Sequence, residues 1–243
     1  MKVMMNKFSP ANCPQTYVNQ NMMGPNVLRL VEELSRSLEL WPGMRILDLG
    51  CGTGLSSMYL ATEFGVEVVA ADLWVRADDN ARRFAAAGMD NKITPINLDI
   101  STLPGLGIFA RDAFDAVVSI NAWHYFASDA LFFDQRIAPY VKGGGTVAIV
   151  IPGLRSSDAE TRPEIHALIA SGIALFTTDR WRAIWSGSQH LAVNQCRHMA
   201  SGRQAWLEWQ KCDNDFAATD AAMRSDELGQ QLRFMQIIGR VNK

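Results

Sequence analysis

Three glycines separated by single residues follow a short apolar stretch, in the sequence DLGCGTG over residues 48–54. Glycine lets the backbone turn sharply and approach a ligand closely. The dinucleotide fingerprint GxGxxG would need a glycine at position 55, where the chain has Leu55. Asp48 precedes the first glycine by two residues, a place that suits a ligand's ammonium group and repels a pyrophosphate. The alternative is a strand–helix turn without a ligand, but such a turn needs one glycine rather than three.

Two more acids and a tryptophan stand near the ends of the next two predicted strands. Asp72 could accept hydrogen bonds from both hydroxyls of a ribose, or it could be an N-cap or surface carboxylate. Trp74 could lie against an adenine ring or contribute to ordinary packing. Asp99 could accept from an adenine amino group, or it could cap the turn at Ser101.

The sequence NAWHYF over residues 121–126 ends a fourth predicted strand. His124 is a candidate general base, because the ordinary pKa of its imidazole lies near neutrality. The alternative is a loop histidine that positions backbone or substrate. Tyr125 could orient a substrate or fill the core.

These residues need a scaffold of strands and helices that alternate along the chain. Strands are predicted at 44–49, 66–72, 93–98, 114–120, 146–151, 191–196 and 234–241, and helices at 27–40, 55–64, 76–87, 128–140 and 202–212. Alternation of this kind predicts an α/β fold with a mostly parallel sheet. Ligands bind such sheets outside the carboxyl ends of the strands. The candidate residues are therefore expected to meet at one edge.

In order and spacing, the motif DLGCGTG, Asp72, Asp99 and the stretch DAVVSINAWHYF resemble the class I S-adenosylmethionine-dependent methyltransferases over residues 27–152. The resemblance implies a Rossmann-like, seven-stranded sheet whose last strand is antiparallel. It also implies that Asp48 and Gly50 lie by the cofactor's methionyl part, Asp72 by its ribose and Asp99 by its adenine. Further cofactor contacts are expected at Tyr17, Cys51, Gly52, Leu73, Trp74, Ile100 and Asn121. The segments NMMGPN, DLW and WHYF are similar to a bacterial group of stand-alone small-molecule methyltransferases.

The activity that this resemblance implies is methyl transfer from S-adenosylmethionine to a small-molecule acceptor, with S-adenosylhomocysteine as product. The protein must align donor and acceptor, exclude water and sometimes remove a proton, for which His124 and Tyr125 are the candidates. Three alternatives stay open: transfer of another group from a related sulfonium, methylation of a protein, and binding of the cofactor without catalysis.

The chain is expected to form a single domain with four parts. Residues 1–26 would be an N-terminal lid that places Tyr17, Asn21 and Met23 over the methionyl end, or else a frayed terminus. Residues 27–153 would be the cofactor-binding core, 154–190 a possible substrate cap, and 191–243 the final strands and a helix. Tryptophan pairs at 181/185 and 206/209 have helical spacing, which favours core packing over a pocket.

Composition excludes several classes of function. Of 243 residues, 48% are hydrophobic and 20% charged, and the net charge of −2 comes without a basic run, which argues against a nucleic-acid partner. No apolar stretch is long enough to span a membrane, and no signal peptide is apparent. The four cysteines lack the spacing of common zinc sites, so no metal is expected. A cytoplasmic protein, monomeric or homodimeric, is the simplest expectation.

Overall fold

A seven-stranded sheet forms the centre of the protein, with strand order β3-β2-β1-β4-β5-β7-β6. The computed structural model describes residues 8, 12–103, 105, 107–219 and 226–243. The strands are β1 (Arg45–Leu49), β2 (Glu67–Asp72), β3 (Ile93–Asn97), β4 (Phe114–Ile120), β5 (Val141–Leu154), β6 (Leu191–His198) and β7 (Leu232–Val241). β7 pairs antiparallel with both β5 and β6, and the other pairs are parallel. The predicted fold class, with its antiparallel last strand, is confirmed.

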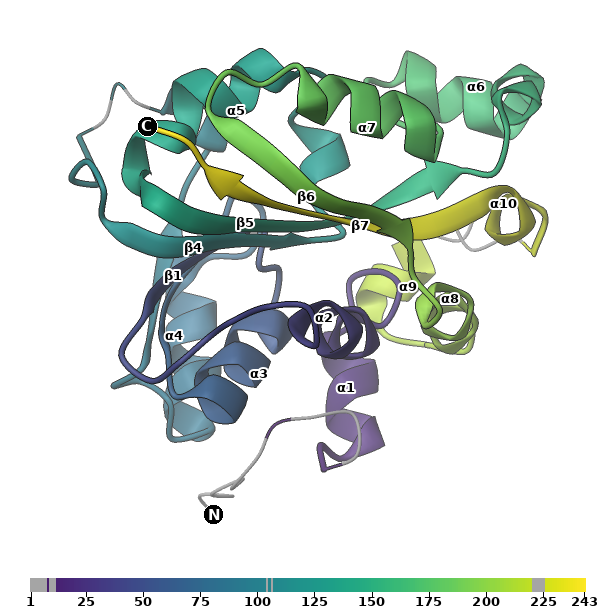
Figure 1. Ribbon diagram of the computed structural model, residues 1–243. Coiled ribbons are helices and arrows are strands. Elements are labelled where there is room, and N and C mark those ends of the chain that lie inside the picture. Colours follow the sequence, from purple (N-terminus) through teal and green to yellow (C-terminus); the bar gives the residue numbers. More distant parts are fainter. Residues whose placement is uncertain (1–7, 9–11, 104, 106, 220–225) are drawn as a thin grey trace.

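Helices cover both faces of the sheet, so the central strands are buried on both sides (Figure 1). One face carries α2 (Val27–Ser35), α3 (Leu55–Phe64), α4 (Ala77–Ala86) and α8 (Gly202–Gln210), and the opposite face carries α5 (Ala130–Arg136), α6 (Pro163–Ala170) and α7 (Thr178–Ser186). Three short helices, α1 (Gln15–Asn21), α9 (Asp215–Thr219) and α10 (Asp226–Gln231), complete the set. Because side chains alternate along a strand, Leu47 and Leu49 of β1 join one hydrophobic cluster while Ile46 joins the other.

Several element boundaries differ from the sequence prediction for identifiable reasons. The helix predicted through residue 140 ends at Arg136 and is followed by a 3₁₀ turn, Ala138–Tyr140, because Pro139 cannot continue an α-helix. The strand predicted at 146–151 begins earlier, at Val141, so the glycines at 143–145 lie inside β5, where the register with β4 shifts between Phe114 and Ala116. The first long helix ends at Ser35, five residues earlier than predicted.

Residues 154–190, predicted as a possible substrate cap, contain the helices α6 and α7. α7 packs against β6, and its Trp181 and Trp185 are buried in the core. The ring centroids of Trp185 and Trp123 lie 5.0 Å apart. Trp206 and Trp209 are buried as well, so the core interpretation of the tryptophan pairs is confirmed, and Trp206 in addition lines a smaller cleft between α8 and β7. Among the described residues, none of the helices has the length and apolar character that crossing a bilayer requires.

Candidate cofactor and substrate site

A cavity enclosing about 1140 Å³, including its part open to solvent, lies at the carboxyl ends of β1, β2 and β4. Its walls come from five stretches of chain: residues 21–25 and 27, 49–53 and 55, 71–74, 98–100, and 120–122 with 125 and 126. This is the edge where parallel α/β sheets bind ligands. The described lining includes nothing from 154–190, so the role of that segment as a substrate cap stays a prediction.

The glycine loop between β1 and α3 forms the floor of this cavity. Gly50, Gly52 and Gly54 have φ angles of 70°, 56° and 85°, the left-handed region that favours glycine. A Cβ on Gly50 would lie 2.3 Å from the Cβ of Ala122, and one on Gly54 would lie 2.4 Å from the ring of Phe84. The loop is therefore packed tightly between the segment after β4 and helix α4, and side chains are excluded at these positions.

Asp48 lies beneath the glycine loop and does not line the cavity. Its Oδ2 accepts hydrogen bonds from the hydroxyls of Ser56 (2.6 Å) and Ser57 (2.7 Å), while Oδ1 is buried without a partner. Burial raises the pKa of this carboxyl to about 6. The place of Asp48 by the methionyl part of a cofactor therefore stays a prediction, with the glycine loop between its carboxyl and the cavity. Alternation along β1 directs the side chain to the face that α3 covers.

Asp72 at the end of β2 both lines the cavity and holds the surrounding backbone. Its Oδ2 accepts from the backbone N–H of Gly52 at 2.8 Å. Its Oδ1 accepts from the backbone N–H groups of Trp74 (2.8 Å) and Val75 (2.9 Å). A carboxylate offers about four acceptor positions, so roughly one remains for a ligand hydroxyl.

The wall beyond Asp72 is apolar and partly open to solvent. Leu73 and Trp74 line the cavity, and Trp74 is 66% exposed with its ring centroid 5.1 Å from that of Tyr125 in an edge-to-face arrangement. Ile100 and Asp99 line the same wall. Asp99 caps the following turn through Oδ1, which accepts from the backbone N–H and the hydroxyl of Ser101, and these bonds lower the pKa of Asp99.

The two residues predicted to be catalytic, His124 and Tyr125, both lie in the 3₁₀ turn Trp123–Tyr125, but their side chains point in different directions. Tyr125 is 42% exposed and lines the cavity. His124 is buried and does not line it, and burial lowers the pKa of its imidazole to about 3. Successive side chains of a 3₁₀ turn point about 120° apart, which explains the separation. The structure therefore does not bring the predicted base to the cavity.

In the described part of the N-terminal segment, Asn21 and Met23 line the cavity and Tyr17 does not. Residues 1–7 and 9–11 lie outside the described residues, and the lid role of 1–26 stays a prediction. The Tyr17 hydroxyl points to α3, 3.9 Å from the sulfur of Met58. The hydroxyl of Thr53 in the glycine loop donates to the carbonyl of Asn21 at 2.6 Å, which joins the segment to the loop.

The remaining predicted positions, Cys51 and Asn121, also line the cavity. Burial, followed by the charges of Asp48 and Asp72, raises the pKa of the Cys51 thiol. Asn121 has a φ of 56° and donates its backbone N–H to the carbonyl of Val150 at 2.8 Å.

One supporting residue escaped sequence analysis. The amide of Asn80 in α4 donates to the carbonyl of Gly52 at 2.8 Å, behind the cavity wall. A single asparagine inside a helix carries no motif, and a buried asparagine facing a loop could have been found from neither spacing nor composition. Phe126 and Gly24 line the cavity too, inside the segments WHYF and NMMGPN. No group of three or more His, Cys, Asp or Glu side chains arranged to hold a metal ion occurs in the described part of the chain.

Residues 46–145 match the family model described as a methyltransferase domain. The chain is 29% identical over 120 residues to the ubiquinone biosynthesis O-methyltransferase of Nitrobacter winogradskyi, covering 49% of this chain and 43% of the relative. It is 38% identical over 134 residues to phosphoethanolamine N-methyltransferase 1 of Arabidopsis thaliana, covering 54% of this chain and 25% of the relative. The chain thus spans less than half the length of these two relatives.

Solved structures share the fold. Geranyl diphosphate C-methyltransferase from Streptomyces coelicolor A3(2), solved with Mg²⁺, geranyl diphosphate and S-adenosyl-L-homocysteine, superposes with a TM-score of 0.68 at 15% identity. The match covers 87% of this chain and 77% of that one. At this identity the likeness concerns the fold.

The buried carboxyl of Asp48 makes stability depend on pH. Its pKa is about 6 in the folded protein against 3.8 ordinarily, so the folded state holds the proton more tightly. The free energy of unfolding should therefore fall as pH rises from about 4 to 6, by roughly 3 kcal/mol at about 1.4 kcal/mol per pKa unit. Asp48→Asn, which still accepts a serine hydroxyl, should lack this fall. Urea unfolding of both proteins at pH 4.5 and 7.5 measures it, and parallel pH curves would show the assignment to be wrong.

Proposed function

We propose that the protein transfers a methyl group from S-adenosylmethionine to a small-molecule acceptor, since residues 46–145 match the model of a methyltransferase domain and lie in a seven-stranded sheet with the order β3-β2-β1-β4-β5-β7-β6. The observation that carries the proposal is the cavity at the sheet edge, with the glycine loop as its floor and Asp72 in its wall. The curated relatives named as methyltransferases support it.

The donor set of the cavity fits this cofactor. Gly50 and Gly52 present bare backbone to the floor, which lets the methionyl part approach closely. The remaining acceptor position of Asp72 suits a ribose hydroxyl. Leu73, Trp74 and Ile100 offer apolar surface for the adenine. The negative charge of Asp48, buried under the loop, attracts the ammonium group across the backbone rather than by contact.

When bound, S-adenosylmethionine supplies an electrophilic methyl with a good leaving group. The chain's own residues then hold the acceptor in line and exclude water. Met23 and Gly24 on one side and Tyr125 on the other bound the space that we assign to the acceptor. The Tyr125 hydroxyl orients the acceptor, and neighbouring His124 supports the Tyr125 ring, with their ring centroids 4.2 Å apart.

The described lining of the cavity offers little general-base capacity. Asp72 is committed to backbone N–H groups, Asp99 caps its turn, and burial keeps the Cys51 thiol protonated. We therefore infer that the acceptor arrives as a nucleophile that needs no proton removed by the protein, such as an amine with a free lone pair. A cytoplasmic location, a monomeric or homodimeric state and the absence of a nucleic-acid partner remain predictions of the sequence.

Asp72 tests the cofactor assignment. S-adenosylmethionine and S-adenosylhomocysteine should bind with constants in the micromolar range, about −8 kcal/mol, and NAD should not compete. Asp72→Ala removes charged hydrogen bonds to loop and ligand, each about 1.5–3 kcal/mol, so affinity should fall tenfold or more and the melting temperature should drop as well. The control is Asp129→Ala, which removes a helix N-cap outside the cavity. Its melting temperature should drop, but its affinity for the cofactor, measured by calorimetry, should not change. Unchanged affinity in folded Asp72→Ala would refute the ribose contact.

A matched pair of glycine substitutions tests the floor. Gly50 and Gly88 have φ angles of 70° and 72°, but a Cβ on Gly88 would meet nothing within 4 Å. Gly88→Ala should lose about 1–2 kcal/mol of stability to backbone strain, and Gly50→Ala should lose more, because its Cβ would also lie 2.3 Å from the Cβ of Ala122. Gly50→Ala alone should also abolish detectable S-adenosylhomocysteine binding, because its Cβ collides with Ala122. Equal affinity in the two variants would contradict a role for this loop in binding.

Substitutions of Tyr125 and His124 distinguish a residue that orients the acceptor from one that removes a proton from it. With its pKa near 3, His124 stays neutral at every assay pH, so His124→Gln should reduce turnover less than about tenfold and leave the pH–rate profile unchanged. Tyr125→Ala should raise the KM for the acceptor while cofactor affinity stays near wild type. Turnover that falls by 10² or more in His124→Gln, with loss of a limb near pH 6.5, would restore the base role.

A further inference from the structure

Two adjoining clefts at the other end of the same sheet edge share Arg155 and His198 and carry a concentration of positive charge. The first, about 570 Å³, is also lined by Arg203 and Arg233, and the second, about 730 Å³, by Thr178 and its neighbours. Across both clefts the described lining holds five arginines and a single carboxylate, that of Asp179. The clefts are therefore positively charged, although the net charge of the chain is −2.

The backbone fixes the arginines at this edge. Arg155 follows β5, and its N–H donates to the carbonyl of Gln231 at 3.0 Å, just before β7 begins. Arg233 stands in β7 opposite Gly153, so both guanidinium groups start from neighbouring strands. The bridge between Leu154 and Thr177 sets the N-terminus of α7 beside them. All of these segments belong to ordered strands or to their immediate flanks.

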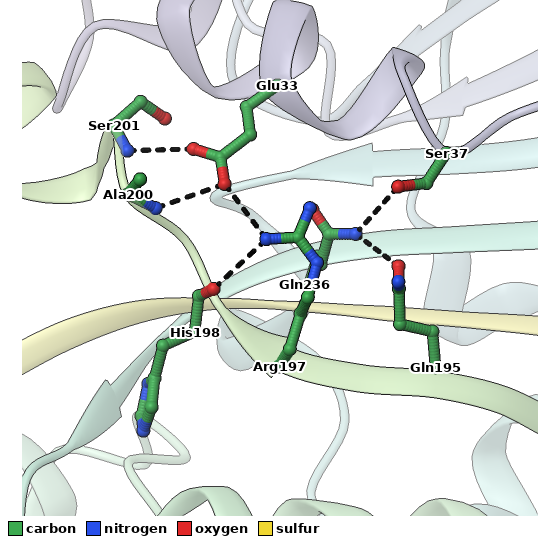
Figure 2. A network of polar contacts seen from close by, with 8 residues as sticks. All are labelled: Glu33, Ser37, Gln195, Arg197, His198, Ala200, Ser201 and Gln236. Carbon is green, nitrogen blue, oxygen red and sulfur yellow. Dashed lines mark hydrogen bonds and ion pairs between the residues drawn. The ribbon is translucent and has the colours of Figure 1, made fainter.

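Two of the arginines in these clefts already have partners within the protein. Arg197 pairs with Glu33 of α2 at 3.1 Å, and the same carboxylate accepts from the backbone N–H groups of Ala200 and Ser201 (Figure 2). Figure 2 shows the His198 side chain pointing away from this network. Arg182 donates to the carbonyl of Cys196.

Arg155, Arg203 and Arg233, in contrast, form no ion pair with a carboxylate of the described chain. All three side chains are exposed.

Other polar groups also belong to the lining of these clefts. The indole of Trp206 lines the first cleft, and its buried Nε1 has no acceptor among the described residues. The Thr178 hydroxyl lies 3.0 Å from Nε2 of His198 in the second. Desolvation and then the charges of Arg233 and Arg155 lower the pKa of His198, against the opposing charge of Asp179, so the arginines lie within electrostatic reach of the imidazole. An excess of positive charge, carried by guanidinium groups, favours an oxyanion.

We propose that these clefts bind a phosphate-bearing small molecule, with Arg155 and Arg233 as the principal contacts and Arg203 as a third. Planar guanidinium groups match phosphate oxygens two at a time. The recessed shape, formed between α7, α8 and three strand ends, favours a compact anion over an extended nucleic-acid strand. None of the residues lining these clefts lines the cofactor cavity, so the site is a second one and does not depend on the proposed methyl transfer.

Pyrophosphate is the probe for the experiment. It is titrated calorimetrically into the full chain with and without saturating S-adenosylhomocysteine, at an ionic strength kept constant with sodium chloride so that screening does not change. Pyrophosphate should bind at one site with equal affinity in both conditions. Loss of binding when S-adenosylhomocysteine is present would place it in the cofactor cavity and overturn the proposal. Absence of binding to the wild-type chain would overturn it as well.

Matched arginine variants locate the site. Arg155→Gln and Arg233→Gln should each weaken pyrophosphate binding about tenfold or more, since a bond to a charged group is lost. Arg111→Gln removes the same charge from an exposed position that lines neither cleft, and should leave binding unchanged. Melting temperature and S-adenosylhomocysteine affinity should stay constant in all three. Equal weakening in Arg111→Gln, or tighter binding of a single-stranded oligonucleotide than of pyrophosphate, would contradict a small-molecule phosphate site.

Discussion

The carboxylate of Asp72 is the interaction on which the cavity depends. It joins the loop after β1, through the N–H of Gly52, to the turn after β2, through the N–H groups of Trp74 and Val75. Hydrogen bonds from backbone N–H groups to a carboxylate are strong and directional. It sets the floor and one wall of the cavity at fixed positions, and the amide of Asn80 holds the loop from behind. The ligand surface is therefore largely preformed.

Much of this arrangement could be predicted from the sequence because it follows from local rules. The motif DLGCGTG fixes a turn that only glycines can make, and buried strands separated by amphipathic helices fix the sheet and its order along the chain. Asp72, Asp99, Trp74 and Tyr125 were predicted at strand ends, and the structure brings them to one cavity. Strand ends and glycine turns are features that sequence spacing encodes directly.

The side-chain directions at Asp48, His124 and Tyr17 could not be predicted in the same way. Each lies within a few residues of the cavity, yet its side chain points to a different surface. The pleat of β1 sets the direction of the Asp48 side chain. For His124 it is set by a three-residue turn, in which the His124 carbonyl accepts from the backbone N–H of Ala174 at 2.9 Å. A shift of one residue reverses the direction of a side chain, and spacing alone does not resolve such a shift. The arginines at 155, 203 and 233 are likewise far apart in sequence and become neighbours only through the topology.

The way in which the N-terminal wall is fastened has a consequence for how the protein is made. The amide of Asn214 donates to the carbonyls of Asn19 and Met22, and the backbone N–H of Asn26 donates to the carbonyl of Ala205. The wall made early in translation thus acquires its anchor some 190 residues later. A nascent chain on the ribosome has the glycine loop but not the closed pocket. These contacts of the N-terminal wall can therefore form only after residues 205–214 have been synthesised, well after the glycine loop itself.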